Sequence, residues 1–511
     1  MLARVFSAAV VGLDGVLVEV EVDIQNQGLP SFTIVGLPDK AVEEAKERVR
    51  SAIKNTGCEF PQKRITVNLA PADLPKEGAS YDLPIALGIL IASGQILTET
   101  NNMFFTGELS LDGRLRHTNG ILPMVLAAKE KQFKQIYLPA INANEASIVK
   151  AVEVYPVETL LTLLRHLTKE MVIKPQKTKS LESYMQNQVY EFDMADVKGQ
   201  EQAKRALEIA AAGGHNLLLK GPPGAGKTLL ARTLPSILPK LTLNESLEVT
   251  KIYSISGLLD KNPIVTERPF RSPHHTTSHI GLIGGGQNPK PGEISLAHRG
   301  ILFLDEFPEF PRHVLEALRQ PMEDGFVVIS RASGRVLFPS KFILFAAQNP
   351  CPCGYFGDPM HDCKCMPGQV MRYQKRVSGP MLDRIDIHLD VPAVKIDKLT
   401  SKEKDNNESS KIIQKRVQAA RDIQTKRFKG TKTNSNAEMT NKDIRKFCEL
   451  SDECLSLLRL AVTKMQLSAR SYQRIIKLSR TIADLENSVE IKPQHIAEAL
   501  QYRPKIENTM Y

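Results

Sequence analysis

Apolar and polar residues alternate between positions 16 and 24, where valine or isoleucine stands at every second position. A period of two predicts a strand with one mainly polar face. Further elements of both kinds follow, so we expect residues 1–168 to form an α/β domain. In chain order, the predicted elements are a helix over 38–57, a strand over 64–69, a helix over 83–92, a hairpin over 104–114 and the residues that follow, a helix over 124–130 and a strand over 135–138.

The pattern changes beyond this first domain. Residues 169–188 are basic and polar with little periodicity, which is typical of a linker. Three apolar runs, at 216–220, 300–304 and 341–347, then predict buried central strands of one sheet. We expect a nucleotide-binding core over 189–395, a polar charged linker with an amphipathic helix over 396–438, and a helical bundle over 439–505.

Composition narrows the class of protein. A chain of 511 residues is too long for one ordinary hydrophobic core, so several domains are expected. The net charge of +10 favours a polyanionic partner, with a generally basic surface as the alternative. The apolar start runs at once into acidic residues, unlike a signal peptide, and no segment has the length of a membrane span. We therefore expect a cytoplasmic protein without membrane contact, in which cysteines do not form a disulfide framework.

A glycine-rich stretch joins the apolar run at 216–220 to a helical run at 229–234. Its sequence, GPPGAGKT, is the full P-loop pattern in the strand-loop-helix setting that the pattern requires. Backbone N–H groups of such a loop bind the phosphates of ATP, while the lysine reaches the β- and γ-phosphates and the threonine binds Mg²⁺. The predicted nucleotide-binding residues are Gly221, Pro222, Pro223, Gly224, Ala225, Gly226, Lys227 and Thr228.

Two more apolar runs end in polar residues that suit ATP hydrolysis. Asp305 and Glu306 follow the run at 300–304; we expect Asp305 in the Mg²⁺ shell and Glu306 to polarise the attacking water. A pair of helix-capping acids is the alternative interpretation. The run at 341–347 leads to Asn349, which could orient the water or contact the γ-phosphate. An ordinary turn asparagine before a proline is the alternative.

Four cysteines crowd into one short segment, as the pairs Cys351/Cys353 and Cys363/Cys365. Four thiolates could bind Zn²⁺ tetrahedrally and hold together a loop that has no core of its own. His361 could replace one of the ligands. Reduced cysteines shielded from solvent are the alternative.

The order of these features, P-loop, acidic strand, polar-tipped strand and helical carboxyl-terminal part, is that of AAA+ ATPases. Longer motifs make the likeness specific: Gly199-Gln200, Phe270-Arg-Ser-Pro-His-His275, Gly284-Gly-Gly286, Pro291-Gly-Glu-Ile-Ser-Leu-Ala-His298, Asn349-Pro-Cys-Pro-Cys-Gly354, Ser378-Gly-Pro-Met-Leu-Asp-Arg-Ile-Asp386 and Arg480-Thr-Ile-Ala-Asp-Leu485. Through them nearly the whole chain resembles the ComM/YifB family of bacterial AAA+ proteins, which are akin to magnesium-chelatase motor subunits and MCM helicases.

The resemblance implies roles for two further arginines. Arg384 matches the arginine finger that enters the neighbouring subunit's site, where it would neutralise charge on the γ-phosphate in the transition state. Arg470 matches the sensor-2 arginine of a helical lid. The alternatives are an ion pair of Arg384 with Asp383 or Asp386, and the assignment of the sensor to Arg474 or Arg480.

A hairpin is predicted over 327–338, with apolar strands on both sides of a tip at Ser333 and Gly334. In MCM-type relatives a hairpin at this place points into the channel of a ring. The resemblance therefore implies that Arg331 and Arg335 contact DNA phosphates. A solvated hairpin with ordinary surface charges is the alternative.

The first domain resembles the Lon protease domain, a fold like domain 2 of ribosomal protein S5. Ser80 matches the region of the Lon nucleophile, but Leu122 stands where Lon has a general-base lysine. Because a serine hydroxyl without a base is a poor nucleophile, we expect this domain to lack proteolytic activity. It would then serve in oligomerisation or DNA binding.

The predicted fold class is therefore α/β: an AAA+ P-loop core, a carboxyl-terminal helical lid and an amino-terminal Lon-like domain. The resemblance implies an ATP-dependent DNA motor, a hexameric helicase that promotes branch migration in homologous recombination during natural transformation. Its expected ligands are ATP, Mg²⁺ and a structural Zn²⁺, and its partners single-stranded and branched DNA and further copies of itself. The residues alone predict ATP hydrolysis coupled to a basic channel, which leaves as alternatives a magnesium-chelatase motor subunit, a Lon-like ATP-dependent peptidase and a nucleotide-gated scaffold.

Overall fold

The computed structural model divides the chain into two compact units. The amino-terminal unit contains Met1–Asn187 and also Leu243–Thr266, and the P-loop unit contains Gln188–Thr242 and Glu267–Tyr511. Parts of the predicted linkers and the predicted hairpin tip at Ser333 lie outside the described residues. The structure describes residues 2–178, 184, 190–259, 262–286, 289–331, 334–393, 408–431 and 433–504.

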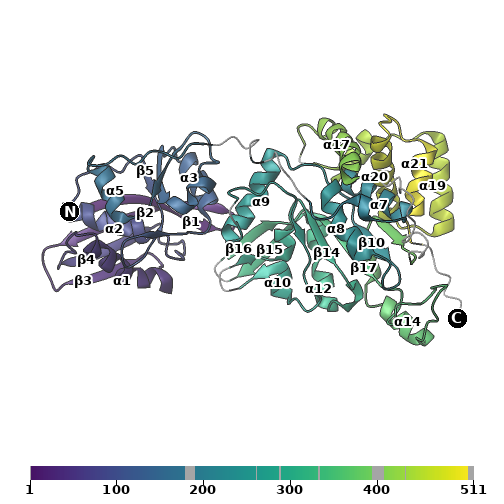
Figure 1. The fold of residues 1–511 in the computed structure, drawn as a ribbon, viewed down its shortest axis with the longest axis horizontal. Helices are drawn as coiled ribbons and strands as arrows, with labels where there is room; N and C mark the ends of the chain where they lie inside the picture. The colour runs from purple at the N-terminus through teal and green to yellow at the C-terminus, as the bar shows by residue number, and fades with distance from the viewer. Residues whose placement is uncertain are drawn as a thin grey trace. The chain divides into compact units, whose positions relative to one another are not determined.

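The amino-terminal unit is built on a seven-stranded mixed sheet in the order β3-β4-β2-β1-β5-β8-β9 (Figure 1). The first two strands form a long antiparallel hairpin, and β2 also pairs antiparallel with β4. All other neighbours in this sheet are parallel. The strands are β1 (Leu2–Val11), β2 (Asp14–Gln25), β3 (Ser31–Val35), β4 (Arg64–Ala70), β5 (Met103–Phe105), β8 (Gln135–Pro139) and β9 (Glu153–Val157).

Helices cover this sheet. The apolar helix α2 is buried along its whole length and packs on β1 and β2, where Gly88 allows close approach to Val22 because a Cβ would lie 2.5 Å from the valine Cγ2. The predicted hairpin is present and pairs β6 (Glu108–Leu109) with β7 (Leu115–Arg116), but it begins later than predicted, because β5 belongs to the main sheet. The helices are α1 (Lys40–Asn55), α2 (Asp82–Ala92), α3 (Ile121–Glu130), α4 (Ala143–Ala146) and α5 (Leu160–Leu167).

Helix α9 (Leu243–Ser256) belongs to the amino-terminal unit, although it follows the P-loop in the sequence. It packs on α3, and the Ser254 hydroxyl donates to the Glu145 carboxylate at 2.5 Å. The same carboxylate accepts from the backbone N–H of Leu122 at 2.9 Å, at the start of α3. Burial raises the pKa of Glu145, against the hydrogen bonds from Ser254 and Leu122. These contacts hold α9 against α3 and Glu145 of this unit.

The P-loop unit contains a parallel five-stranded sheet in the order β11-β14-β17-β10-β18, so the P-loop strand β10 lies between β17 and β18. Residues of β10, β14 and β17 are almost all buried, as expected for central parallel strands. The strands are β10 (Leu217–Lys220), β11 (Phe270–Arg271), β14 (Ile301–Leu304), β17 (Ile343–Gln348) and β18 (Ile387–Asp390).

Helices pack around this sheet and continue to the end of the described chain. The predicted amphipathic helix is α17, which packs on α7, α8 and α20 (Figure 1). Within the described ranges, none of the helices combines the length and the apolar character needed to cross a membrane. The main helices are α7 (Glu201–Gly213), α8 (Lys227–Ile237), α17 (Ser410–Arg427), α18 (Asn441–Phe447), α19 (Asp452–Met465), α20 (Ala469–Leu485) and α21 (Pro493–Gln501).

Smaller elements connect β11, β14, β17 and β18. The predicted hairpin is present and pairs β15 with β16 in antiparallel register. The smaller elements are α10 (His279–Ile283), β12 (Gly284–Gly285), β13 (Lys290–Pro291), α11 (Glu293–Leu296), α12 (Arg312–Ala317), α13 (Arg319–Asp324), β15 (Phe326–Arg331), β16 (Gly334–Pro339), α14 (Pro367–Gln374) and α15 (Gly379–Leu382).

Candidate nucleotide-binding site

The P-loop connects the buried end of β10 to the first turn of α8. Gly224 and Gly226 have φ angles of +77° and +81°, which favour glycine, and open space faces the position of a Cβ at both residues. Gly221 is required for a different reason, because a Cβ there would lie 2.2 Å from the Val391 carbonyl oxygen. The loop is therefore a backbone cradle open to a ligand, at the amino end of a helix that favours anions.

Lys227 is largely buried, with 8% of its surface exposed. Its Nζ donates to the carbonyl oxygens of Gly221 at 2.6 Å and Pro222 at 3.0 Å, and to Asn349 Oδ1 at 3.0 Å. Burial lowers the pKa of this ammonium, and the nearby Asp305 opposes that shift. The lysine head therefore lies between the P-loop and the tip of β17, where Asn349 follows the strand.

The acidic residues after β14 lie beside the P-loop threonine. Thr228 donates from Oγ1 to Asp305 Oδ2 at 2.9 Å, and the other carboxylate oxygen of Asp305 accepts from the backbone N–H of Glu306 at 2.9 Å. Oxygen atoms of this kind suit Mg²⁺, which usually takes one or two protein ligands and keeps several waters. The donors present therefore fit a Mg²⁺ bound together with a nucleotide.

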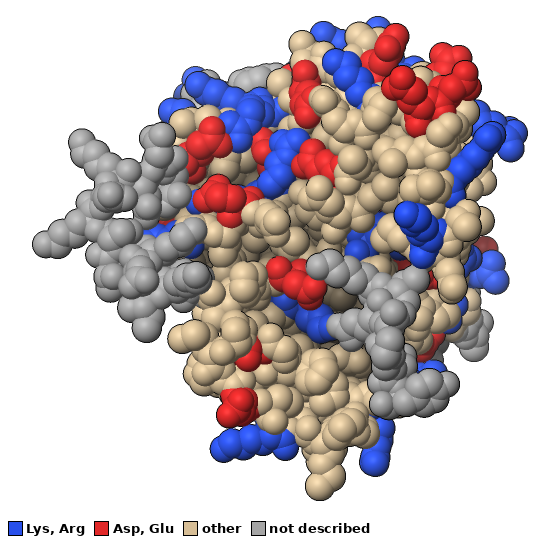
Figure 2. Space-filling view, turned by 90° about the vertical axis from the view of Figure 1, so that its right-hand side faces the viewer, with Lys and Arg blue, Asp and Glu red and all other residues tan. Residues whose placement is uncertain are grey.

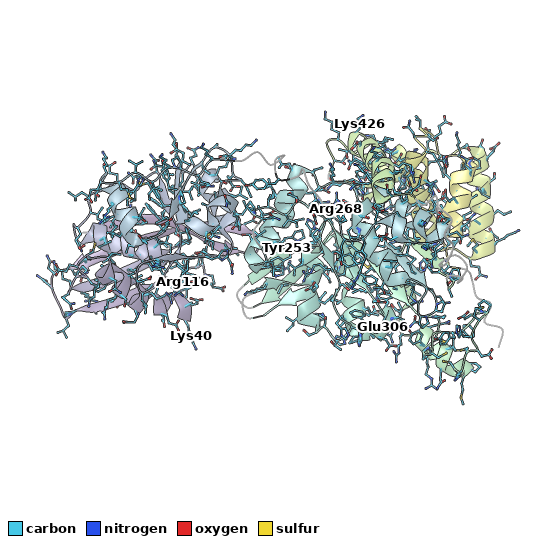
Figure 3. The ribbon with its side chains drawn as sticks, viewed as in Figure 1. Lys40, Arg116, Tyr253, Arg268, Glu306 and Lys426 are labelled. Carbon is cyan, nitrogen blue, oxygen red and sulfur yellow. The ribbon has the colours of Figure 1, made fainter. Side chains whose placement is uncertain are left out.

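Glu306 follows β14 and its side chain is exposed (Figure 3). Its φ of +50° turns the chain sharply just after the strand. The carboxylate Oε2 lies 3.5 Å from His275 Nδ1, in the segment after β11. An exposed carboxylate next to the Mg²⁺ ligands can polarise a water molecule, as the sequence predicts.

Gln200 contacts the P-loop through its side-chain amide. Its Nε2 donates to the Ala225 carbonyl oxygen at 2.6 Å, and it precedes α7 with a left-handed φ of +58°. The Gly199-Gln200 motif is thus in direct contact with the loop that it accompanies in the sequence pattern.

The four cysteines after β17 form one compact group. Their Sγ atoms all lie within 4.8 Å of one another, and the Sγ separations among Cys351, Cys353 and Cys363 are 3.3 to 3.7 Å. A tetrahedral Zn²⁺ with Zn–S bonds of about 2.3 Å would separate its sulfur ligands by roughly 3.8 Å, so the donor set fits this metal. Backbone N–H groups of Cys353 and Phe356 also point at cysteine sulfur atoms. His361 instead contacts Asp358 at 3.0 Å and is not in the group.

The cysteine-rich loop also contacts the P-loop. A Cβ at Gly354 would lie 2.5 Å from Pro223 Cδ, and Gly354 has a φ of +88°. Cys351 is two residues beyond Asn349, the partner of Lys227. The loop is therefore bound to the nucleotide site at two places.

Arg384 is placed in the interior, where its side chain is 5% exposed. Its Nη2 lies 2.5 Å from Glu323 Oε1 and its Nη1 donates to the Pro380 carbonyl oxygen at 2.7 Å. The alternative ion pair with Asp383 or Asp386 is wrong, because the carboxylate that pairs with Arg384 comes from α13. Neither Arg384 nor Arg470 bonds to the P-loop of its own chain within the described residues.

The three arginines considered for the sensor have different surroundings. Arg480 is buried and pairs with Asp484 at 3.0 Å, and Arg474 pairs with the buried Asp386. Arg470 is 56% exposed, in the first turn of α20, and lies 3.5 Å from Glu323. Of the three, only Arg470 is not paired with a buried carboxylate, so its exposed side chain can contact a ligand outside this chain.

Asp386 is the centre of a buried polar network between β18 and α20. Its carboxylate contacts Arg474, and its Oδ2 lies 3.3 Å from His215 Nδ1. The other ring nitrogen of His215, Nε2, lies 2.8 Å from Thr481 Oγ1. Burial opposes the ionisation of Asp386, but Arg474 and His215 together hold its pKa well below its usual range. Arg474 also donates to the Arg384 carbonyl oxygen at 2.6 Å, which fixes the backbone of the predicted finger.

The predicted DNA contacts lie on the β15–β16 hairpin. Arg331 pairs in register with Gly334 at the end of the hairpin, and the Arg335 side chain is exposed. On the face of the molecule in Figure 2, basic and acidic side chains are interspersed between large uncharged areas. The excess positive charge of the chain is therefore not gathered into one basic patch on that face.

In the amino-terminal unit, Ser80 has no activating base among the described residues. It is 6% exposed, and its hydroxyl has no hydrogen-bond partner within the described residues. Leu122, at the expected position of a general base, is fully buried. The buried Lys76 donates to the Pro71 carbonyl oxygen instead.

In a comparison with known protein families, parts of the chain match three family models. Residues 193–399 match the model for the magnesium chelatase, subunit ChlI; residues 20–142 match that for subunit ChlI of Mg-chelatase; and residues 407–503 match that for the carboxyl-terminal part of the same subunit. A magnesium-chelatase 38 kDa subunit of Cereibacter sphaeroides is 25% identical over 31% of this chain and 53% of its own length.

Two full-length relatives are much more similar. The competence protein ComM of Haemophilus influenzae is 45% identical over 99% of this chain and 98% of its own length. The uncharacterised protein YifB of Escherichia coli is 43% identical over 98% of this chain and 97% of its own length.

The parallel sheet, the P-loop cradle with its acidic neighbours and the family match define a magnesium-chelatase-like AAA+ protein, a class that implies ATPase activity with ATP and Mg²⁺. More narrowly, the chain belongs to the ComM/YifB family.

Proposed function

We propose that the protein is an ATP-driven DNA motor, active as a ring that is most simply a hexamer, and that it promotes branch migration of recombining DNA during natural transformation. The observation that carries this proposal is the 45% identity to a competence protein along essentially the whole of both chains. The nucleotide site supports the motor, since Lys227 is hydrogen-bonded to Asn349 and Thr228 to Asp305.

In this proposal each residue of the nucleotide site has a defined task. The P-loop backbone and Lys227 bind the phosphates, while Thr228 and Asp305 hold Mg²⁺, which neutralises phosphate charge when bound. Glu306 accepts a proton from the attacking water, and Asn349 orients that water. Arg384 and Arg470 act on the nucleotide of the neighbouring protomer, which makes hydrolysis depend on assembly. Arg331 and Arg335 contact the DNA backbone.

We also propose that Cys351, Cys353, Cys363 and Cys365 bind one structural Zn²⁺. The support is the convergence of four sulfur atoms within 4.8 Å of one another in a loop of little secondary structure. Purified protein is expected to contain about one zinc per chain, and Cys363→Ser to lose most of it. Full-length protein prepared with ample zinc that still contains none would refute the site.

A three-stranded branch-migration assay with wild type and Glu306→Gln tests the motor. Wild type is expected to move branches in an ATP-dependent reaction and to hydrolyse ATP faster when DNA is added. Glu306→Gln should bind ATP but move no branch. Wild-type protein that hydrolyses ATP at a rate indifferent to DNA, and moves no branch, would contradict the proposal.

Two other activities are less well supported. The magnesium-chelatase subunit matches only 31% of this chain, and the cysteine-rich loop lies at the nucleotide site, which favours a specialised motor. The amino-terminal unit, which we take to have a Lon-like fold, has no base beside Ser80 among its described residues and is proposed to serve in assembly or DNA binding. Protein turnover that is abolished by Ser80→Ala would instead establish a peptidase.

A further inference from the structure

Glu323 joins two arginines that come from separate parts of the P-loop unit. Its Oε1 lies 2.5 Å from Arg384 Nη2 and 3.5 Å from Arg470 Nη2. Arg384 precedes β18, Arg470 belongs to α20, and Glu323 is near the end of α13. One carboxylate oxygen therefore lies close to both guanidinium groups that, in the proposed function, contact the nucleotide of the neighbouring protomer.

The ion pair between Glu323 and Arg384 differs from an ordinary surface ion pair. The Arg384 side chain is 5% exposed, whereas Glu323 is 42% exposed, so the carboxylate is the solvent-facing member. The backbone of Arg384 is held in place by the hydrogen bond from Arg474 to its carbonyl oxygen. Arg384 Nε is buried and has no hydrogen-bond partner among the described residues. A guanidinium has five N–H donors, so Arg384 retains capacity for a further anionic acceptor.

Carboxylate and phosphate oxygens compete for the same donors of a guanidinium group. While Glu323 binds Arg384 and Arg470, these donors are not available to a γ-phosphate. We propose that Glu323 is a positioning residue that occupies the place of the γ-phosphate. It pairs with Arg384 and Arg470 while the nucleotide site of the neighbouring protomer is empty, and these ion pairs break when ATP binds to that site. The inference rests on the proposed assembly, in which both arginines act across a protomer boundary.

Glu323 is also placed to report on DNA. Gly325, with a φ of +73°, ends α13 and is followed directly by β15 of the hairpin that carries Arg331 and Arg335. The Gly325 carbonyl oxygen accepts from Ser340 at 2.8 Å, just after β16, so both strands of the hairpin are tied to the end of α13. A displacement of the hairpin by DNA would move Glu323 and weaken its hold on the arginines. Release of the pair then raises the rate of ATP hydrolysis.

The test compares Glu323→Gln with the matched variant Asp324→Asn. Asp324 is the next residue of α13, is exposed, and has no ion pair within the described part of the chain. Both changes remove one negative charge, but only the first removes the competitor of the phosphate. Assembly is followed by sedimentation velocity as the slowly hydrolysed analogue adenosine 5′-O-(3-thiotriphosphate) is added to full-length protein.

Glu323→Gln is expected to assemble at a roughly tenfold lower analogue concentration than wild type and to show a higher ATPase rate without DNA, with little further stimulation by DNA. Asp324→Asn should behave as wild type, and Glu323→Asp, which keeps the charge on a shorter side chain, should fall between. Thermal unfolding confirms that each variant is folded.

Three results would count against the role of Glu323: an unchanged or higher assembly midpoint in Glu323→Gln, an equal shift in Asp324→Asn, or an ATPase loss in Glu323→Gln with normal stimulation by DNA. In each case the ring and its ATPase activity would stand. Wild type that stays monomeric with the analogue would instead overturn both the proposed assembly and this inference.

Discussion

Lys227 and Asn349 share a hydrogen bond of 3.0 Å between Nζ and Oδ1, which connects the P-loop to the tip of the neighbouring strand β17. The bond holds the lysine head at the position where phosphate is expected and orients the asparagine amide toward the same place. It joins residues 122 positions apart in the chain, through two adjacent parallel strands.

Loss of this asparagine is expected to impair hydrolysis more than binding. Asn349→Ala should lower kcat for ATP by about 10²-fold, because the attacking water and Lys227 lose a fixed partner, while ATP affinity changes little. Steady-state ATPase kinetics and fluorescent-nucleotide titration measure the two effects. The matched control is Gln348→Ala, whose side chain has no hydrogen bond within the described ranges. Equal losses in the two variants would argue against a role for Asn349.

Glu306→Gln should abolish turnover while ATP stays bound. Removal of a general base typically costs roughly 10²- to 10⁴-fold in rate, whereas the P-loop contacts do not involve this carboxylate. Single-turnover assays should show bound, uncleaved ATP. Glu309→Gln, which changes a nearby acid paired with Arg376, is the control and should retain most of the activity. Normal turnover in Glu306→Gln would show that Glu306 is not the general base.

The contact of the cysteine-rich loop with the P-loop can be tested with two glycines. Gly354 and Gly357 have similar φ angles of +88° and +79°, but only a Cβ at Gly354 would meet Pro223, while nothing lies within 4 Å of one at Gly357. Gly354→Ala is expected to weaken ATP binding by about tenfold, equivalent to roughly 1.4 kcal/mol. Gly357→Ala carries the same backbone strain and should leave ATP affinity within about twofold.

Chelation of zinc from the wild type should reproduce the effect of Gly354→Ala, since the cysteines hold the loop that bears this glycine. Isothermal titration with ATP before and after chelation measures it. ATP affinity that is unchanged by Gly354→Ala would show that the loop does not support the nucleotide site.

The buried Asp386 network predicts a pH-dependent stability. Because the pKa of Asp386 is lower in the folded chain than the unfolded value of about 3.9, its contribution is fully present above that pH and is lost as the pH falls through the folded pKa. Asp386→Asn should cost about 3 kcal/mol or more at neutral pH, since Arg474 loses its charged partner. Denaturant unfolding should show this difference shrinking below about pH 4.

Asp383→Asn is the control for that measurement, because Asp383 lies three residues away and has no ion pair within the described residues. A difference between wild type and Asp386→Asn that is unchanged from neutral to acidic pH would mean that packing, rather than charge, sets the effect.

The nucleotide site was accessible to sequence reasoning because its chemistry is local. The P-loop pattern and Asp305 with Glu306 follow apolar strands directly, and the structure brings Thr228 and Asp305 into contact. Strand β1 was not predicted, because its sequence, LARVFSAAVV, does not alternate strictly between apolar and polar residues.

Partners distant in the sequence could not be assigned in this way. Glu323 lies 61 residues from Arg384, and nothing in the pattern around it distinguishes it from the other exposed acids. The placement of α9 in the amino-terminal unit likewise depends on tertiary packing, which one sequence does not reveal.

The polypeptide passes between the two units three times, after Asn187, after Thr242 and after Thr266. A fragment that stops at residue 187 would therefore lack α9 and expose the Glu145 carboxylate that Ser254 normally covers. The two units are thus not separable by a single cleavage, and residues 238–242 alone lead from the P-loop helix α8 to α9 of the amino-terminal unit.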